Sequence, residues 1–322
     1  METNTRLRPQ PENQSALIFM GTGCSGGVPS LRCLIQPSHP PCPVCSQSLS
    51  IPPHFNPNYR CNTSLLIDYC QKNGEHRYIL IDMGKTFREQ LLRWFTLYKI
   101  PRLDSVVLTH EHADAVHGLD DIHSVNQFGV TNSVSPLPIY ATRECVDSVL
   151  SRFPNLSMDA HKKGRVQRQE SPQVDWRIIQ AQYEIPFVAS GLQFNPLPVM
   201  HGEDYVSLGY LFGDKCKVAY VSDVSRFPSS TESVISESGG GQLDLLILDT
   251  NTIHLIEGPS THFCFPKALD AIKKIRPKNA FLIGMNHAYD HDRINASLVD
   301  WSQREGVPVQ LAYDGLRVPV EL

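Results

Sequence analysis

One stretch of sequence decides the fold: residues 105–114, which run Ser-Val-Val-Leu-Thr-His-Glu-His-Ala-Asp. Its apolar first part predicts a short buried strand that ends at Thr109. Residues two apart in extended backbone point to the same side, so His110 and His112 are placed to share one metal ion. Asp114 lies two residues further, where the chain is expected to turn into a helix, and is placed to reach a second ion.

A single histidine is more often a surface or core residue than a metal ligand. Three ligand-type residues at a spacing of two, directly after an apolar strand, favour the metal site over that alternative. Several other predicted strands also end in His or Asp, which places polar side chains along one edge of a sheet. The predicted strands are 15–20, 63–69, 78–81, 105–109, 137–141, 192–199, 207–212, 217–222, 243–248, 280–283 and 309–312, and the predicted helices are 87–98, 144–153 and 266–275.

The motif Thr-His-x-His-x-Asp, followed by Gly118, resembles the signature of the metallo-β-lactamase fold superfamily. The resemblance extends over about residues 16 to 315 and implies an α/β fold, a four-layer αβ/βα sandwich. The superfamily's remaining motifs can be matched in chain order to Asp82, His201, Asp223 and His287.

The resemblance also implies a role for each matched residue. The superfamily's first catalytic ion is held by histidines that correspond to His110, His112 and His201. The ligands of its second ion correspond to Asp114 and His287, and Asp223 would bridge the two ions. Asp82 corresponds to an aspartate that orients a ligating histidine from behind.

One position departs from the superfamily pattern His-x-His-x-Asp-His, because residue 115 is Ala. The second ion would therefore lose a nitrogen ligand. Asp120 or Asp121, one to two helical turns further along, is a candidate for compensation, with a solvated helix face as the alternative for this acidic pair. The sequence leaves open one or two catalytic divalent ions, zinc or manganese, because a carboxylate-rich site also suits manganese.

A second group of ligand-type residues lies in a proline-rich stretch. Cys42 and Cys45 form a Cys-x-x-Cys pair, and Cys33 precedes the pair by nine residues. Structural zinc takes four thiolate or imidazole ligands, so a third cysteine nearby favours one structural zinc ion over incidental or redox-active thiols.

The cysteine group resembles one branch of the superfamily, the phosphodiesterases of the bacterial phosphonate-degradation (carbon–phosphorus lyase) pathway. These enzymes hold a structural zinc with three early cysteines and one late histidine, and the pyrroloquinoline quinone biosynthesis B proteins have a related cluster. The resemblance implies His291 as the late histidine here, with His39 and His54 as local competitors.

Ser260-Thr261-His262, directly before a predicted helix, resembles the place where these phosphodiesterases and the related tRNA 3′-processing endonucleases carry a catalytic histidine. A histidine with a pKa near ~6.5 can protonate a leaving alkoxide. The alternative is a surface histidine near a helix cap. The resemblance implies attack by metal-bound hydroxide, with His262 and Asp223 as catalytic residues.

The order of the motifs predicts one domain, because ligands spread from His110 to His287 must converge. We expect a flexible tail over residues 1–14 and a single metallo-β-lactamase-like domain over 15–322. Within that domain we expect a Cys/Pro-rich zinc loop over 36–60 and an exposed insertion over 157–176.

Composition narrows the class of protein further. The 322-residue chain is 41% hydrophobic with a net charge of −4, which supplies a core and argues against an extensive nucleic-acid-binding surface. The first residues lack the apolar centre of a signal peptide, and no run approaches the ~18 apolar residues of a membrane span. We expect a cytoplasmic protein, with an organelle left open, and a small-molecule phosphodiester or nucleotide-like substrate. We expect no membrane partner, and a homodimer is left open.

Together these features predict a metal-dependent hydrolase, a phosphodiesterase acting on a small or cyclic phosphodiester. Three alternatives stay open: a hydrolase of another ester, thioester or lactone; an oxidative protein like the pyrroloquinoline quinone biosynthesis B proteins; and a non-catalytic, zinc-stapled binding protein with a degraded second metal site. Fold alone does not separate these functions.

Overall fold

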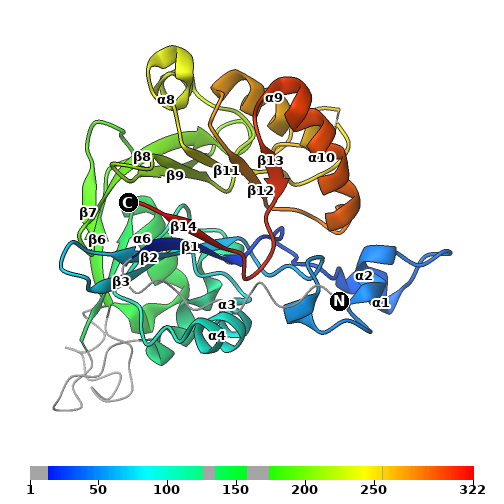
Figure 1. The fold of residues 1–322 in the computed structure, drawn as a ribbon. Helices are drawn as coiled ribbons and strands as arrows, with labels where there is room; N and C mark the ends of the chain where they lie inside the picture. Colours follow the sequence, from blue (N-terminus) through cyan, green and yellow to red (C-terminus); the bar gives the residue numbers. More distant parts are fainter. Residues whose placement is uncertain (1–13, 126–134, 158–173, 256) are drawn as a thin grey trace.

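A computed structural model describes residues 14–125, 135–157, 174–255 and 257–322 of the chain. The predicted tail at 1–14 and the predicted insertion at 157–176 lie almost entirely outside these ranges. Two seven-stranded sheets face one another, and helices cover the outer side of each (Figure 1). This arrangement confirms the predicted α/β four-layer sandwich.

The first sheet joins the two ends of the chain, because β1 pairs antiparallel with both β2 and the final strand β14. β3 continues the antiparallel order, and β4 to β6 are added in parallel. In spatial order the strands are β14 (Arg317–Val320), β1 (Ser15–Gly21), β2 (Ser64–Cys70), β3 (His76–Ile81), β4 (Ser105–Val107), β5 (Leu137–Ala141) and β6 (Val174–Ile178).

The second sheet is antiparallel at one side and parallel at the other. β7 to β10 pair antiparallel, whereas β10 to β13 pair in parallel. In spatial order the strands are β13 (Val309–Leu311), β12 (Ala280–Ile283), β11 (Leu245–Asp249), β10 (Val218–Val221), β9 (Val206–Phe212), β8 (Leu192–Met200) and β7 (Phe187–Ala189). The parallel strands β10, β11 and β12 are buried along their whole length, as expected where both faces of a sheet are covered.

Three apolar cores hold the layers together. The central core lies between the sheets, and the other two lie under the outer helices. The helical segments on the first sheet are α3 (Phe87–Gln90), η3 (Leu91–Phe95), α4 (Thr96–Tyr98), α5 (Ala113–Val116), η4 (His117–Ser124), α6 (Arg143–Arg152) and η5 (Pro154–Leu156). Those on the second are α8 (Ser229–Ile235), η6 (Glu237–Gly239), α9 (Phe265–Ile275) and α10 (His291–Glu305).

A small lobe projects from the sandwich, and we call residues 30–56 the cysteine lobe (Figure 1). The sequence predicted an irregular loop for most of it, but the lobe contains the short helices α1 (Leu31–Ile35) and α2 (Pro43–Gln47) and the 3₁₀ turn η2 (Pro53–Phe55). Proline at the first helical position favours such starts, because its fixed φ suits a helix and its missing N–H is not needed there.

The ends of four strands lead into one region between the sheets. β4 is followed by His110, β8 by His201 and β10 by Asp223, and β11 ends at Asp249. Because the sheets fix the backbone at these ends, side chains far apart in sequence meet there. Among the described residues, every helix is too short or too polar to cross a membrane.

Candidate functional site

His110 is held from behind by a chain of hydrogen bonds. Asp82, buried after β3, accepts hydrogen bonds of 2.8 Å from the backbone N–H and the hydroxyl of Thr109. Because that hydroxyl gives its hydrogen to Asp82, it accepts from His110 Nδ1, 2.8 Å away. Burial raises the pKa of Asp82, and the two hydrogen bonds from Thr109 oppose this rise. Asp82 therefore acts on His110 through Thr109.

This arrangement leaves His110 Nε2 with a free lone pair. The atom is buried and has no hydrogen-bond partner within the described residues. Burial lowers the pKa of His110, which keeps the ring neutral. A buried, neutral and unpaired imidazole nitrogen has the form that a metal ligand requires.

His201 presents a second imidazole nitrogen with a lone pair directed toward the group. Its Nδ1 donates a 2.6 Å hydrogen bond to the carbonyl oxygen of Thr261, which can only accept, so its Nε2 also carries a lone pair. That Nε2 lies 3.3 Å from His112 Nδ1. Burial lowers the pKa of His201 to about 4, which again favours the neutral ring.

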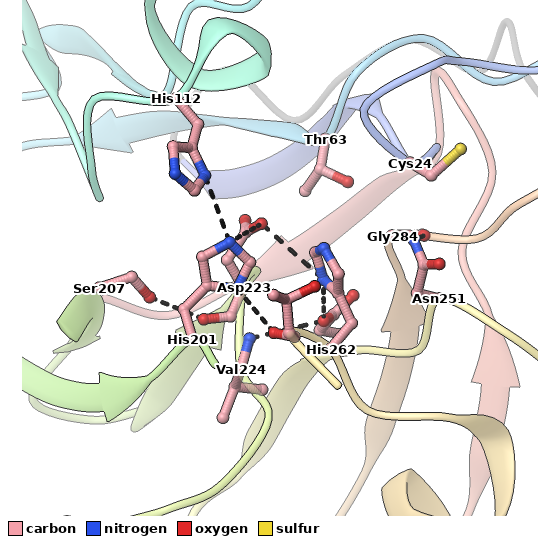
Figure 2. A network of polar contacts seen from close by, with 12 residues as sticks. Cys24, Thr63, His112, His201, Ser207, Asp223, Val224, Asn251, His262 and Gly284 are labelled. Carbon is pink, nitrogen blue, oxygen red and sulfur yellow. Dashed lines mark hydrogen bonds and ion pairs between the residues drawn. The ribbon is translucent and has the colours of Figure 1, made fainter. Parts of the chain in front are cut away.

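Asp223 completes this group of donors. Its Oδ1 lies 3.9 Å from His110 Nε2 and 3.8 Å from His201 Nε2. Burial alone would raise the pKa of Asp223, but the attraction of His110, His262 and His201 outweighs burial and lowers it. Donor atoms of His110, His112 and His201 all lie within 4.8 Å of one another, which fits a divalent cation. Figure 2 shows His112, His201 and Asp223 of this group beside His262.

His112, the exposed member of the group, is flanked by a tyrosine that the sequence reasoning missed. The ring of Tyr205 stacks on His112 with centroids 5.1 Å apart and an interplanar angle of 11°. The Tyr205 hydroxyl donates a 2.6 Å hydrogen bond to Glu111 Oε2. Tyr205 therefore restricts the orientation of the His112 ring, together with the rings of His110 and His201.

His262 lies beside the donor group and is paired with Asp249, the fully buried last residue of β11. Its Nδ1 lies 2.7 Å from Asp249 Oδ2 and 3.9 Å from Asp223 Oδ1. Burial opposes protonation of the ring, but Asp249 and then Asp223 outweigh it and raise the pKa of His262 to about 9. Burial raises the pKa of Asp249 to about 7, so at neutral pH the shared proton resides on His262.

Asp249 was not among the residues predicted from sequence. The signal that could have found it is the same one that found Asp223: a buried strand, here Leu245–Asp249, that ends in an aspartate. His201, Asp223 and His262 also form a group of donor atoms within 4.8 Å of one another.

The three predicted cysteines meet a histidine, but it is His287 and not His291. His287 Nδ1 lies 3.5 Å from the Sγ atoms of both Cys33 and Cys42, and the donor atoms of these residues and Cys45 fall within 4.8 Å of one another. The set matches the Cys₃His ligands of structural zinc. His291 instead begins α10, where its N–H bonds Asn58 Oδ1 at 2.8 Å.

This placement corrects two assignments at once. His287 lies at the cysteines rather than at the second catalytic ion, and His291 is not the fourth cysteine-site donor. The physical reason is local: between β12 and α10 the chain turns so that His287 faces the cysteine lobe, while His291 is used to start the helix.

Two acidic residues predicted for the second ion are not brought into any donor group of the described chain. Asp114 lies half-buried on α5, from where its charge acts on His110 and His262. Asp121 does not compensate for Ala115, because its Oδ1 lies 3.7 Å from Arg88 Nη1 on the outer surface. Ala115 itself is buried in the apolar core under the first sheet.

Comparisons with known proteins agree with this geometry. A family model described as the beta-lactamase superfamily domain matches residues 77–285. An octanoyltransferase of Porphyromonas gingivalis (strain ATCC BAA-308 / W83) is 28% identical over 270 residues, which cover 84% of this chain. They cover 46% of that protein, so the chain spans about half the length of this relative.

Two solved structures share the architecture over nearly the whole chain. A new diphosphatase from the PhnP family has a TM-score of 0.72 and 27% identity, and the match covers 96% of this chain and 99% of that one. Zn²⁺-bound PqqB from Methylobacterium extorquens has a TM-score of 0.65 and 16% identity, with 95% and 100% covered. At that lower identity the likeness to PqqB shows the fold alone.

Proposed function

This chain belongs to the beta-lactamase superfamily, and we propose that it is a metal-dependent phosphodiesterase that hydrolyses a small or cyclic phosphodiester. The sequence predicted the superfamily and a likeness to its phosphonate-pathway branch. The family model confirms the superfamily, and the likeness to the PhnP-family diphosphatase supports the branch. The hydrolase fold follows from that membership. The phosphodiester is the part we propose.

The observation that carries the proposal is the group of nitrogen and carboxylate donor atoms that the strand ends bring close together. His110 Nε2 and His201 Nε2 have lone pairs fixed by their Nδ1 partners, and the Asp223 carboxylate lies beside them. A divalent ion bound there, zinc or manganese, would lower the pKa of a coordinated water to near ~7 and neutralise charge on phosphoryl oxygens. The cysteine lobe would hold a separate structural zinc.

His262 supplies the acid that this chemistry needs. Hydrolysis adds one water across a P–O bond: the hydroxyl stays on phosphorus, and the leaving oxygen takes up a proton. His262 Nδ1 is engaged by Asp249 at 2.7 Å, which leaves Nε2–H to donate that proton. Asp249 keeps the ring oriented and charged until the proton is given.

The comparisons support a phosphorus-centred reaction more than an acyl one. The solved relative at 27% identity is named a diphosphatase. A hydrolase of an acyl ester, thioester or lactone is the second candidate, because the relative at 28% identity is named an octanoyltransferase. That name describes a protein of which this chain spans 46%, so it favours the acyl reaction less.

A substrate panel separates the two candidates. Purified protein would be assayed on bis(p-nitrophenyl) phosphate, 2′,3′- and 3′,5′-cyclic nucleotides, a dinucleoside diphosphate and an octanoyl thioester. We expect hydrolysis of a phosphodiester, abolished by chelation and reduced at least ~10²-fold in His262→Ala. His123→Ala, which changes an exposed histidine on η4, is the matched control and should act like wild type.

Each other outcome has a definite meaning. Turnover of the thioester alone would replace the phosphodiesterase with the acyl hydrolase. Activity in His262→Ala equal to wild type would remove the proposed acid. A protein that binds the ions but turns over none of these substrates would fit the non-catalytic or the oxidative alternative.

A further inference from the structure

We infer that the catalytic centre holds one metal ion rather than two, and that the Asp249–His262 pair occupies the flank of Asp223 where a second ion would need donors. This inference rests on the metal centre of the proposed function and concerns its composition. The superfamily resemblance implied ligands for two ions, and the sequence left open whether one or two are bound because residue 115 is Ala.

The first ion has a sufficient set of ligands. His110, His112 and His201 present their donor atoms within 4.8 Å of one another, and Asp223 lies beside two of them. Catalytic zinc sites in proteins typically have three protein ligands and one position open to water or substrate. The group therefore needs no further residue to hold one ion.

The second ion has lost almost every ligand assigned to it. His287 lies 3.5 Å from the sulfurs of Cys33 and Cys42, so it serves the cysteine site. Residue 115 is a buried alanine, and Asp121 faces Arg88. Asp120 is exposed and belongs to none of the donor groups of the described chain. Apart from the shared Asp223, only the carboxylate of Asp114 is left of the predicted set, and one such group is too few for a divalent ion.

Within the described part of the chain, the strand ends show why another side chain does not take the place of these ligands. The parallel neighbours β10, β11 and β12 lead to Asp223, Asp249 and Gly284. Gly284 has a φ of +76°, and a Cβ built on it would lie 2.1 Å from Asp249 Oδ1. Asp249 thus takes the space that a side chain at the end of β12 would require, and this strand delivers no donor.

His262 is the remaining candidate donor, and its environment argues against a separate second site. It forms a donor group with His201 and Asp223, but both of these residues already belong to the first ion. Its Nδ1 lies 3.9 Å from Asp223 and is engaged by Asp249 at 2.7 Å. The donor group that contains His262 therefore shares residues with the group that binds the first ion and does not form a separate site.

Counting ions tests the inference independently of activity. The full chain would be saturated with zinc, desalted and analysed by plasma mass spectrometry. We expect two ions per chain, one in the cysteine lobe and one in the centre. His201→Ala and Cys42→Ser should each lose one ion, whereas Asp114→Asn and His262→Ala should keep both. Three ions in the wild type, or the loss of an ion from Asp114→Asn or His262→Ala, would overturn the inference.

Cobalt substitution covers the case in which a variant fails to fold. Only the cysteine site gives thiolate-to-cobalt charge-transfer absorption, so titration of the wild type with cobalt counts the two kinds of site separately. We expect one equivalent of cobalt that produces charge-transfer absorption and one equivalent that does not. Two equivalents of cobalt without charge-transfer absorption would contradict the inference. If two ions are bound but no phosphodiester is cleaved, the proposed function is wrong and the one-ion centre stands. If a third ion is bound and a phosphodiester is cleaved, the one-ion centre is wrong and the proposed function stands.

Discussion

The proposed catalytic centre and the cysteine lobe both bring together residue types that bind metal, yet the two groups are supported in opposite ways. The centre draws His110, His201 and Asp223 from the ends of strands whose backbone is fixed by two sheets. The lobe draws Cys33, Cys42 and Cys45 from helices of five residues and their flanks. We therefore expect the first site to keep its shape without an ion and the second to depend on a bound ion for its shape.

Burial shows the same contrast. Leu31, Ile35 and Leu49 of the lobe are 71%, 74% and 76% exposed, so little apolar surface is removed from water there. His110 and His201, by comparison, are 3% and 5% exposed and have outer hydrogen-bond partners. Removing an ion should therefore cost function at the centre and local structure in the lobe.

The largest effect is expected from His201→Ala. This change removes a ligand of the catalytic ion, and a loss of several kcal/mol of transition-state stabilisation corresponds to about 10³-fold in kcat/KM. The fold should persist, because the sheets rather than the ion hold the strand ends. Urea denaturation monitored by circular dichroism should show a free energy of unfolding within ~1 kcal/mol of wild type. A protein that unfolds on this change would break the contrast between the two sites.

Cys42→Ser should have the converse effect. If the proposed zinc ion links the cysteines to His287, its loss should loosen the lobe, so residues 30–56 should become the first sites of proteolysis. Limited trypsin digestion with mass spectrometry measures this directly, and Arg32 offers a cleavage site within the lobe. Cys70→Ser, which changes a half-buried cysteine at the end of β2, is the control and should leave the lobe as resistant as in wild type.

The next effect concerns the pH dependence of the centre rather than its ion. His262 must be protonated to act as an acid, so activity should fall as pH rises through the pKa of His262, about 9. In Asp249→Asn the neighbouring negative charge is gone, so that pKa falls and the alkaline limb of kcat moves to lower pH. A divalent cation bound nearby would lower the pKa of His262 in both proteins. The pKa of His262 would still be lower in Asp249→Asn than in the wild type. If the pH–rate profiles of the two proteins had the same alkaline limb, Asp249 would not set the pKa of the catalytic acid.

How much of this contrast was predictable depends on where each residue lies. His110, His112, His201 and Asp223 follow strands whose apolar runs are visible in the sequence, and the structure brings all four together. The choice between His287 and His291 could not be made that way, because both lie in one short connection before α10. Which of them faces the cysteine lobe is set by the turn of the backbone, and periodicity carries no information about that turn.

The missed residues have the same explanation. Asp249 could have been found because it ends a buried strand. Its pairing with His262 could not, because the two residues lie 13 apart in sequence and meet across a loop. Tyr205 carried no signal, because its stacking on His112 crosses from the loop after β8 to the loop after β4. Contacts between loops depend on the packing of two sheets, which sequence patterns fix only approximately.

The smallest effect is expected at His112, the ligand that is exposed to solvent as much of the lobe is. Tyr205→Ala removes the stacked ring, which is worth about 1 kcal/mol, so zinc should bind the centre about fivefold more weakly. Tyr205→Phe keeps the ring and loses only the hydrogen bond to Glu111, and should bind zinc like wild type. Competition with a chromophoric chelator measures both affinities. Equal weakening in the two variants would show that the hydroxyl, not the ring, positions His112.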